Sequence, residues 1–149
     1  MAEHDKDIEA LIERIKQFYD EFSVDKLDGL DAIYTDDVGF TDPIHQVTGL
    51  TKLREYFRGV MENVEHCHFA FTEQACTGEW LFLAWQMRFA HPKLANGREI
   101  VMPGVSQFHL HEGKVRTQQD HYDMGAMLYE HVPVLGFVVN KIKQRLANS

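Results

Sequence analysis

The segment HCHFAF, residues 66–71, marks the point where the hydrophobic pattern changes from a period of 3.6 residues to a period of 2. The same alternation continues through Trp80–His91, Arg98–Leu110 and Lys114–Tyr122. Turn-forming residues separate these segments, and the last connection, His111-Glu112-Gly113, is typical of a tight hairpin. We therefore expect four long strands that follow one another as an antiparallel meander.

The residues before this segment follow a helical pattern. A first amphipathic helix is predicted from apolar residues at helical spacing, namely Ile8, Leu11, Ile12, Ile15, Phe18, Tyr19 and Phe22. A shorter helix is expected over residues 27–34, ended by Thr35-Asp36-Asp37, and a third from Gly49 to Val64. Between them, Val38–Thr41 is expected to be extended and to end at Asp42-Pro43, because the residue before a proline is pushed out of helical geometry.

The C-terminal residues are predicted to be helical. Asp123 can cap a short helix through Tyr129, and Pro133 can begin a last helix. The basic residues Lys141, Lys143 and Arg145 suit the negative end of that helix's dipole.

Helices followed by long antiparallel strands predict one α+β domain over residues 1–149, with a core at about 8–123 and a helical extension at 124–147. Long strands normally curl, and a curved sheet wrapped over helices leaves a cavity at its open end. We expect the functional site in that cavity.

The charge balance excludes several classes of partner. Lys plus Arg number 15 and Asp plus Glu 23, so 15 − 23 gives −8, which argues against nucleic-acid binding. The longest apolar run, Val132–Val139, is too short to cross a membrane, and the acidic first residues predict a cytoplasmic protein.

Cys67 and Cys76 are expected to be free, buried thiols on opposite faces of a strand.

Several motifs in one order resemble the nuclear transport factor two-like superfamily, in particular its SnoaL-like polyketide cyclase and ketosteroid isomerase-like branch. The motifs are Tyr19, Leu27-Asp28-Gly29-Leu30, residues 34–43 (YTDDVGFTDP), Gly49, Glu112-Gly113-Lys114-Val115 and Asp120-His121-Tyr122-Asp123. The resemblance implies a cystatin-like α+β roll, in which a cone-shaped curved antiparallel sheet packs on N-terminal helices and is followed by a C-terminal helical tail.

Comparison with ketosteroid isomerase implies one catalytic candidate. The aspartate of that enzyme's Asp-Pro pair is the base that moves the proton, and Asp42 matches it by position. The enzyme's two oxyanion donors fall on Phe18 and Ser106, and Tyr19 lies one residue away from the first of them. An alternative interpretation is that Asp42 only stabilises the Asp-Pro turn.

Comparison with limonene epoxide hydrolase implies a second candidate. One of its catalytic aspartates matches Asp120, while its Arg-x-Asp pair falls on Gln86 and Arg88. The resemblance implies that the face of the strand with Gln86 and Arg88 lines the cone, where Arg88 could orient a ligand oxygen or, alternatively, form an ion pair with Asp120. The reverse orientation would place Trp85 and its neighbours in the core.

These observations lead to a hypothesis of a cofactor-independent acid–base enzyme, of the isomerase, cyclase, dehydratase or hydrolase type, acting on a small, largely apolar molecule with a polar oxygen. Asp42 or Asp120 would move the proton. The substrate-binding residues would be Phe18, Tyr19, Phe40, Tyr56, Gln86, Arg88, Ser106 and Tyr122. The alternatives are a non-catalytic carrier of apolar ligands and a structural adaptor whose cone is filled by side chains.

Two further expectations concern the surface. If Gln86 and Arg88 face the cone, the apolar face with Trp85 and Met87 needs cover, which predicts a two-fold homodimer through the outer face of the sheet. His66-x-His68 and His109-x-His111 have a spacing that can chelate a metal, but no Asp or Glu is in step beside either pair. We therefore expect no metal site.

Overall fold

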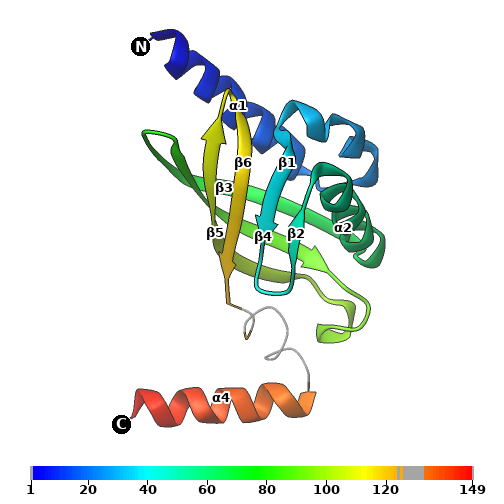
Figure 1. Cartoon of the computed structure of the whole chain (residues 1–149). Helices are drawn as coiled ribbons and strands as arrows, with labels where there is room; N and C mark the ends of the chain where they lie inside the picture. The colour runs from blue at the N-terminus through cyan, green and yellow to red at the C-terminus, as the bar shows by residue number, and fades with distance from the viewer. Residues whose placement is uncertain (1, 124, 126–132, 149) are drawn as a thin grey trace.

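The computed structural model describes residues 2–123, 125 and 133–148, and it has the α+β architecture predicted from the sequence (Figure 1). The elements in chain order are α1 (Ala2–Asp20), the 3₁₀ helix η1 (Val24–Ala32), β1 (Tyr34–Thr41), β2 (Gln46–Thr48), α2 (Leu50–Asn63), β3 (His66–Thr77), β4 (Trp80–Ala90), the 3₁₀ helix η2 (Ala95–Gly97), β5 (Ile100–His111), β6 (Lys114–Tyr122) and α4 (Pro133–Ala147).

One six-stranded sheet organises the fold. Its strand order is β2-β1-β6-β5-β4-β3, so the predicted meander of β3 to β6 forms four consecutive strands of the sheet. Strand β1 joins this meander by pairing parallel to β6, and β2 pairs antiparallel to β1. The parallel pair connects the N-terminal half of the chain directly to the last strand, which carries Asp120.

The second helix of the prediction is partly wrong. A 3₁₀ helix ends at Ala32, and residues 35–37, predicted to stop a helix, lie within β1. Strand β1 buries Tyr34 and Val38 but leaves Asp36 and Asp37 exposed, and its pairing with β6 shifts register between Tyr34 and Gly39. That irregularity disrupts the simple alternation of a strand, which explains why the pattern was misread.

The core lies between the helices and one face of the sheet. Helix α1 buries Leu11, Ile15 and Phe18, and α2 buries Leu53 and Phe57, as their helical spacing predicted. These side chains meet inward-pointing residues of β1 and of the meander, such as Leu81, Leu83 and Phe108.

The turns and the C-terminal helix follow the sequence signals. Glu112 and Gly113 both have positive φ, at 49° and 78°, which a two-residue type I′ hairpin requires. Helix α4 begins at Pro133 as predicted and exposes Val134, Phe137 and Leu146. Asp123 accepts a hydrogen bond from the Gly125 N–H at 2.8 Å, while the helix predicted through Tyr129 lies outside the described residues.

The prediction for the two cysteines is partly confirmed. Cys67 and Cys76 are both free thiols, but only Cys67 is buried, so the prediction was wrong for Cys76.

Among the described helices, none has both the length and the apolar character needed to span a lipid bilayer. The cytoplasmic location stays a prediction from the sequence.

Gly104 allows the Trp85 ring to pack closely against the backbone of β5. It pairs with Trp85 across β4 and β5, and a Cβ built at this position would overlap the Trp85 ring. We predict that Gly104→Ala lowers the free energy of unfolding by about 1–3 kcal/mol, because the ring has to move out of a packed wall.

Gly59→Ala is the matched control for this prediction. Gly59 lies inside α2, and apart from its chain neighbours and the backbone of its own helix no atom lies within 4 Å of the position that an added methyl group would take. The same substitution should there raise the free energy of unfolding by about 0.5–1 kcal/mol. Urea denaturation of both variants checks the pair. Equal effects of the two substitutions would contradict the proposed overlap.

Candidate active site

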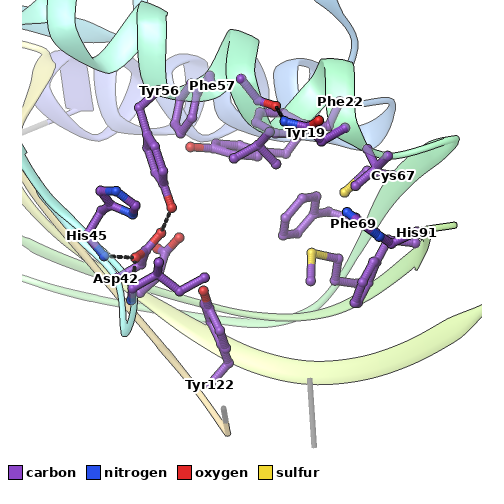
Figure 2. Close-up of a pocket in the computed structure, with 18 of the residues that line it drawn as sticks. Tyr19, Phe22, Asp42, His45, Tyr56, Phe57, Cys67, Phe69, His91 and Tyr122 are labelled. Atoms are coloured by element: carbon purple, nitrogen blue, oxygen red, sulfur yellow. Dashed lines mark hydrogen bonds between the residues drawn. The ribbon is translucent and has the colours of Figure 1, made fainter. Parts of the chain in front are cut away.

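A cavity of about 740 Å³ opens between the sheet and the helices. Its walls are mostly apolar and aromatic, with Phe22, Phe57, Phe69 and Trp85 among the lining residues. Figure 2 shows polar groups gathered at one end of it, where Asp42, Tyr56 and Tyr122 point toward one another. We call the part of the cavity lined by Asp42, Asp120, Tyr56 and Tyr122 the acidic end.

Strand β4 faces the opposite way from the expectation. Trp85, Met87 and Phe89 line the cavity, whereas Gln86 and Arg88 are exposed on the outer face. The two faces of β4 both carry apolar residues, so alternation alone could not show which one is buried. The predicted ligand contacts of Gln86 and Arg88, and the dimer contact through Trp85 and Met87, are therefore wrong.

Arg88 has a different partner from the one considered. Its Nη1 lies 3.1 Å from Oε1 of Glu99, and both side chains are about half exposed. The alternative of an Arg88–Asp120 ion pair is also wrong, because the two residues belong to opposite faces of the sheet.

Asp120 lies at the centre of a hydrogen-bond network on the cavity wall. Its Oδ1 accepts hydrogen bonds from the Ser106 hydroxyl at 2.6 Å and from the Gln118 amide at 2.9 Å. Trp85 Nε1 donates to the Ser106 oxygen at 2.9 Å, so Ser106 has its own proton free to donate to Asp120. Within the described part of the chain, no hydrogen bond involves Oδ2 of Asp120, which leaves this oxygen available to a ligand.

Gln118 is held in turn by two buried tyrosines. The Tyr34 hydroxyl donates to Gln118 Oε1 at 2.6 Å, Gln118 Nε2 donates to the Tyr19 hydroxyl at 3.3 Å, and the two hydroxyls are 2.6 Å apart. Since Tyr34 gives its proton to Gln118, Tyr19 must donate to Tyr34, and the three groups form a closed ring. This ring fixes the orientation of the amide that binds Asp120.

Gln118 and Tyr34 were not among the site residues predicted from the sequence. Gln118 is 2% exposed, and a buried amide with full hydrogen bonding indicates a constrained site. A signal was present in the sequence, because Gln118 and Asp120 are two residues apart on one strand and so share a face.

Burial is the main influence on the acidity of Asp120. It raises the pKa of the carboxyl to about 6, although the hydrogen bonds from Ser106 and Gln118 oppose the increase, and the negative charge of Asp42 adds to it. A carboxyl with this pKa changes its protonation state near neutral pH, which suits a group that takes up and releases a proton.

Asp42 has two roles in the structure. Its Oδ1 accepts the backbone N–H groups of Ile44 and His45 at 2.8 and 2.7 Å, which confirms that it stabilises the turn after β1. Its Oδ2 accepts a hydrogen bond from the Tyr56 hydroxyl at the acidic end of the cavity (Figure 2). Burial and the bond to Asp42 raise the pKa of Tyr56, so its hydroxyl stays protonated at neutral pH.

The remaining predicted residues divide between the wall and the core. Tyr19, Phe40 and Tyr122 line the cavity, whereas Phe18 is buried against Tyr19 and Phe57 and does not line it. Ser106 contacts the site through Asp120. Burial raises the pKa of Tyr122, and within the described residues its hydroxyl makes no hydrogen bond, so it can donate one to a ligand.

The histidine pairs lie outside the cavity and have acidic neighbours that the linear sequence did not reveal. His66 is 3.1 Å from Glu99 and His109 is 3.2 Å from Glu79. Within residues 2–123, 125 and 133–148, no three His, Cys, Asp or Glu side chains are grouped so that they could hold a metal ion.

The SnoaL-like domain family matches residues 15–118, which include β1 and the first part of β6. The chain belongs to the SnoaL-like domain family. No curated protein sequence matches it significantly.

Solved structures similar to this SnoaL-like chain share its fold at low sequence identity. An NTF2-like protein of unknown function from Burkholderia pseudomallei K96243 has a TM-score of 0.71 at 20% identity, covering 82% of this chain and 95% of the other. A ketosteroid isomerase-like protein from Catenulispora acidiphila DSM 44928, in complex with trimethylamine, has a TM-score of 0.69 at 12% identity, covering 79% and 88%. TerC, co-crystallised with polyporic acid, has a TM-score of 0.69 at 15% identity, covering 81% and 95%.

The raised pKa of Asp120 predicts a pH-dependent effect on stability. Above pH 6 the carboxyl is ionised within a wall that disfavours its charge, which lowers the free energy of unfolding. This loss of stability disappears as the pH falls below about 4, the ordinary pKa of an aspartate. Asp120→Asn keeps Oδ1 as an acceptor and removes the charge. The variant should therefore gain about 1–3 kcal/mol in the free energy of unfolding near pH 8 and no advantage near pH 3.5.

Asp36→Asn removes the same charge from an exposed position on β1 and should leave the difference in stability between the two pH values unchanged. Chemical denaturation of the three proteins at both pH values provides the measurement. A gain in stability for Asp120→Asn that does not vary with pH would contradict the explanation that the gain comes from removing a buried negative charge.

Proposed function

We propose that the protein is a cofactor-independent acid–base enzyme acting on a small, largely apolar molecule that carries a polar oxygen. The observation that supports this most directly is Oδ2 of Asp120, a carboxylate oxygen on the wall of an apolar cavity with its partner oxygen already held by Ser106 and Gln118. A base held in this way is oriented before the substrate binds.

In this proposal Asp120 is the proton acceptor. Its Oδ2 removes a proton from a carbon next to the substrate's carbonyl, and the electron pair of the broken C–H bond moves toward the carbonyl oxygen. The Tyr122 hydroxyl donates a hydrogen bond to that oxygen as its negative charge develops. Asp120 then returns the proton to another atom of the same molecule, so the reaction needs no external oxidant or reductant.

Asp42 and Tyr56 have a supporting role in this proposal. Both oxygens of Asp42 already accept hydrogen bonds, from the turn and from Tyr56, so it is less available than Asp120 to take a substrate proton. Its negative charge favours the protonated form of Asp120, which helps Asp120 to hold the proton during transfer. Isomerisation, cyclisation and dehydration all use such a transfer, and hydration or hydrolysis would need a water molecule in addition.

The structural relatives support binding of a small molecule in this fold, since one was solved with trimethylamine and another with polyporic acid. One observation favours the alternative of a non-catalytic carrier. The positions that match the catalytic partners of related enzymes are Phe18 in the core and Gln86 and Arg88 on the outer face. A carrier would retain an apolar ligand in native mass spectrometry and show no turnover.

The first test is a screen of the purified protein against enones, epoxides and polyketide-like esters. With an active compound, Asp120→Asn should reduce kcat/KM by about 10²–10⁴-fold, because it removes the base. Asp42→Asn should have a smaller effect. In the wild type, kcat/KM should fall below pH 6 as Asp120 becomes protonated.

Arg88→Gln is the control, since Arg88 is exposed on the outer face and should leave activity unchanged. Full activity in Asp120→Asn, or the same loss in Arg88→Gln, would refute the assignment of the base.

We also propose a homodimer through the outer face of the sheet, formed by different residues from those first expected. Among the described elements, no helix covers this face (Figure 1), and Val101 and Val105 of β5 are 45% and 37% exposed on it. Two-fold pairing would bury both valines against the same residues of a second copy. Val105→Glu should give a monomer in light scattering with an unchanged circular dichroism spectrum, and an unchanged mass would refute this interface.

A further inference from the structure

We propose that the ligand of the cavity carries a protonated amine, which binds at the acidic end between Asp42, Asp120 and the aromatic rings beside them. This inference rests on the proposed function, because it uses the same cavity and the same two carboxylates. It adds the chemical class of the molecule.

The acidic end contains negative charge without a matching positive charge. Within the described residues, neither Asp42 nor Asp120 makes an ion pair with a Lys, Arg or His side chain, because the ion pairs of the structure involve other acids. The lining residues His91 and Lys93 follow β4, and Figure 2 shows His91 at the end of the cavity away from Asp42. A cationic ligand would supply the counter-charge, and an anionic ligand would add to the repulsion.

The tyrosines at this end do not supply that charge. Tyr19, Tyr56 and Tyr122 are neutral hydroxyls whose pKa values are raised, mainly by burial. The His45 ring is exposed and packs on the Tyr56 ring at a centroid distance of 4.9 Å, and it contacts Asp42 through its backbone N–H.

Aromatic rings surround the acidic end and suit an ammonium group. Tyr56 packs against Phe40 and Phe57, with ring-centroid distances of 5.8 and 6.1 Å, and the Tyr122 ring lies 6.3 Å from that of Trp85. The face of each ring carries negative electrostatic potential, which attracts a cation within about 6 Å. An apolar wall beside two carboxylates thus accommodates both the alkyl part and the charged part of an amine.

The hydrogen-bond geometry points to the same class. Asp42 Oδ2 accepts one hydrogen bond, from Tyr56, and a carboxylate oxygen can accept a second, so an ammonium N–H can bind there while Oδ2 of Asp120 stays free to take the substrate proton. Such a bond is charge-assisted and about twice as strong as a bond between neutral groups. An alcohol could form only the weaker bond there, and a carboxylate ligand could form none without first taking up a proton.

The test compares three probes of similar shape and different charge: cyclohexylmethylamine, cyclohexylmethanol and cyclohexanecarboxylate. Trp80→Phe leaves Trp85 as the only tryptophan, and Trp85 lines the cavity, so its fluorescence reports binding. Near pH 7.5 the amine should bind at least about tenfold more tightly than the alcohol, and the carboxylate should bind most weakly.

Variants in the Trp80→Phe background show whether Asp42 and Asp120 produce the preference for the amine. Asp42→Asn and Asp120→Asn should each reduce the preference for the amine over the alcohol by about tenfold or abolish it, while binding of the alcohol changes little. Asp37→Asn, with the same charge change at an exposed position, should retain the full preference. If one cavity variant fails to fold, the other variant and the three-probe comparison in the unaltered cavity still decide the question.

Equal or tighter binding of the alcohol or the carboxylate would overturn the inference, as would a preference for the amine that survives both cavity substitutions. The assay needs no turnover, so its failure is distinct from failure of the proposed function. A protein that prefers the amine but shows no turnover would support this inference and contradict the proposed enzymatic function.

Discussion

Asp120 combines a negative charge with a position on an apolar cavity wall, and the hydrogen bonds from Ser106 and Gln118 compensate in part for the solvation it loses there. Each donor is itself constrained, Ser106 by Trp85 and Gln118 by the pair Tyr19 and Tyr34. Among the described residues, no buried side-chain nitrogen or oxygen lacks a hydrogen-bond partner. The carboxylate therefore keeps one orientation in a place where an unsupported charge would destabilise the fold.

The same residues connect the site to the architecture. Tyr19 belongs to α1, Tyr34 to β1, Trp85 to β4, Ser106 to β5 and Gln118 to β6, so the network joins five elements of the fold. Parallel pairing of β1 with β6 brings Tyr34 and Gln118 together from positions 84 residues apart. Gly104 lets the Trp85 ring lie flat against β5, where its indole nitrogen reaches Ser106.

Most of the fold was predicted from the sequence, and several of the residues predicted for the site line the cavity. The helical spacing from Ile8, the alternation in the four long strands and the turn at Glu112-Gly113 are local signals, and each appears in the structure, although α1 ends at Asp20, before Phe22. Asp42 and Asp120 were predicted by resemblance, Tyr56 and Tyr122 were predicted as substrate-binding residues, and all four line the cavity. Gln86 and Arg88 were misplaced because a strand with apolar side chains on both faces has the same alternation in either orientation.

The sequence by itself determined the class of fold, the order of its elements and the family, because these follow from the spacing of apolar residues and from short motifs. Tertiary structure alone decided which face of β4 is buried, which acid Arg88 meets, and that Gln118 orients Asp120. These outcomes depend on side chains far apart in the chain, whose contacts are set by how the sheet curves over the helices. A local pattern contains no information about that packing until the strands are paired.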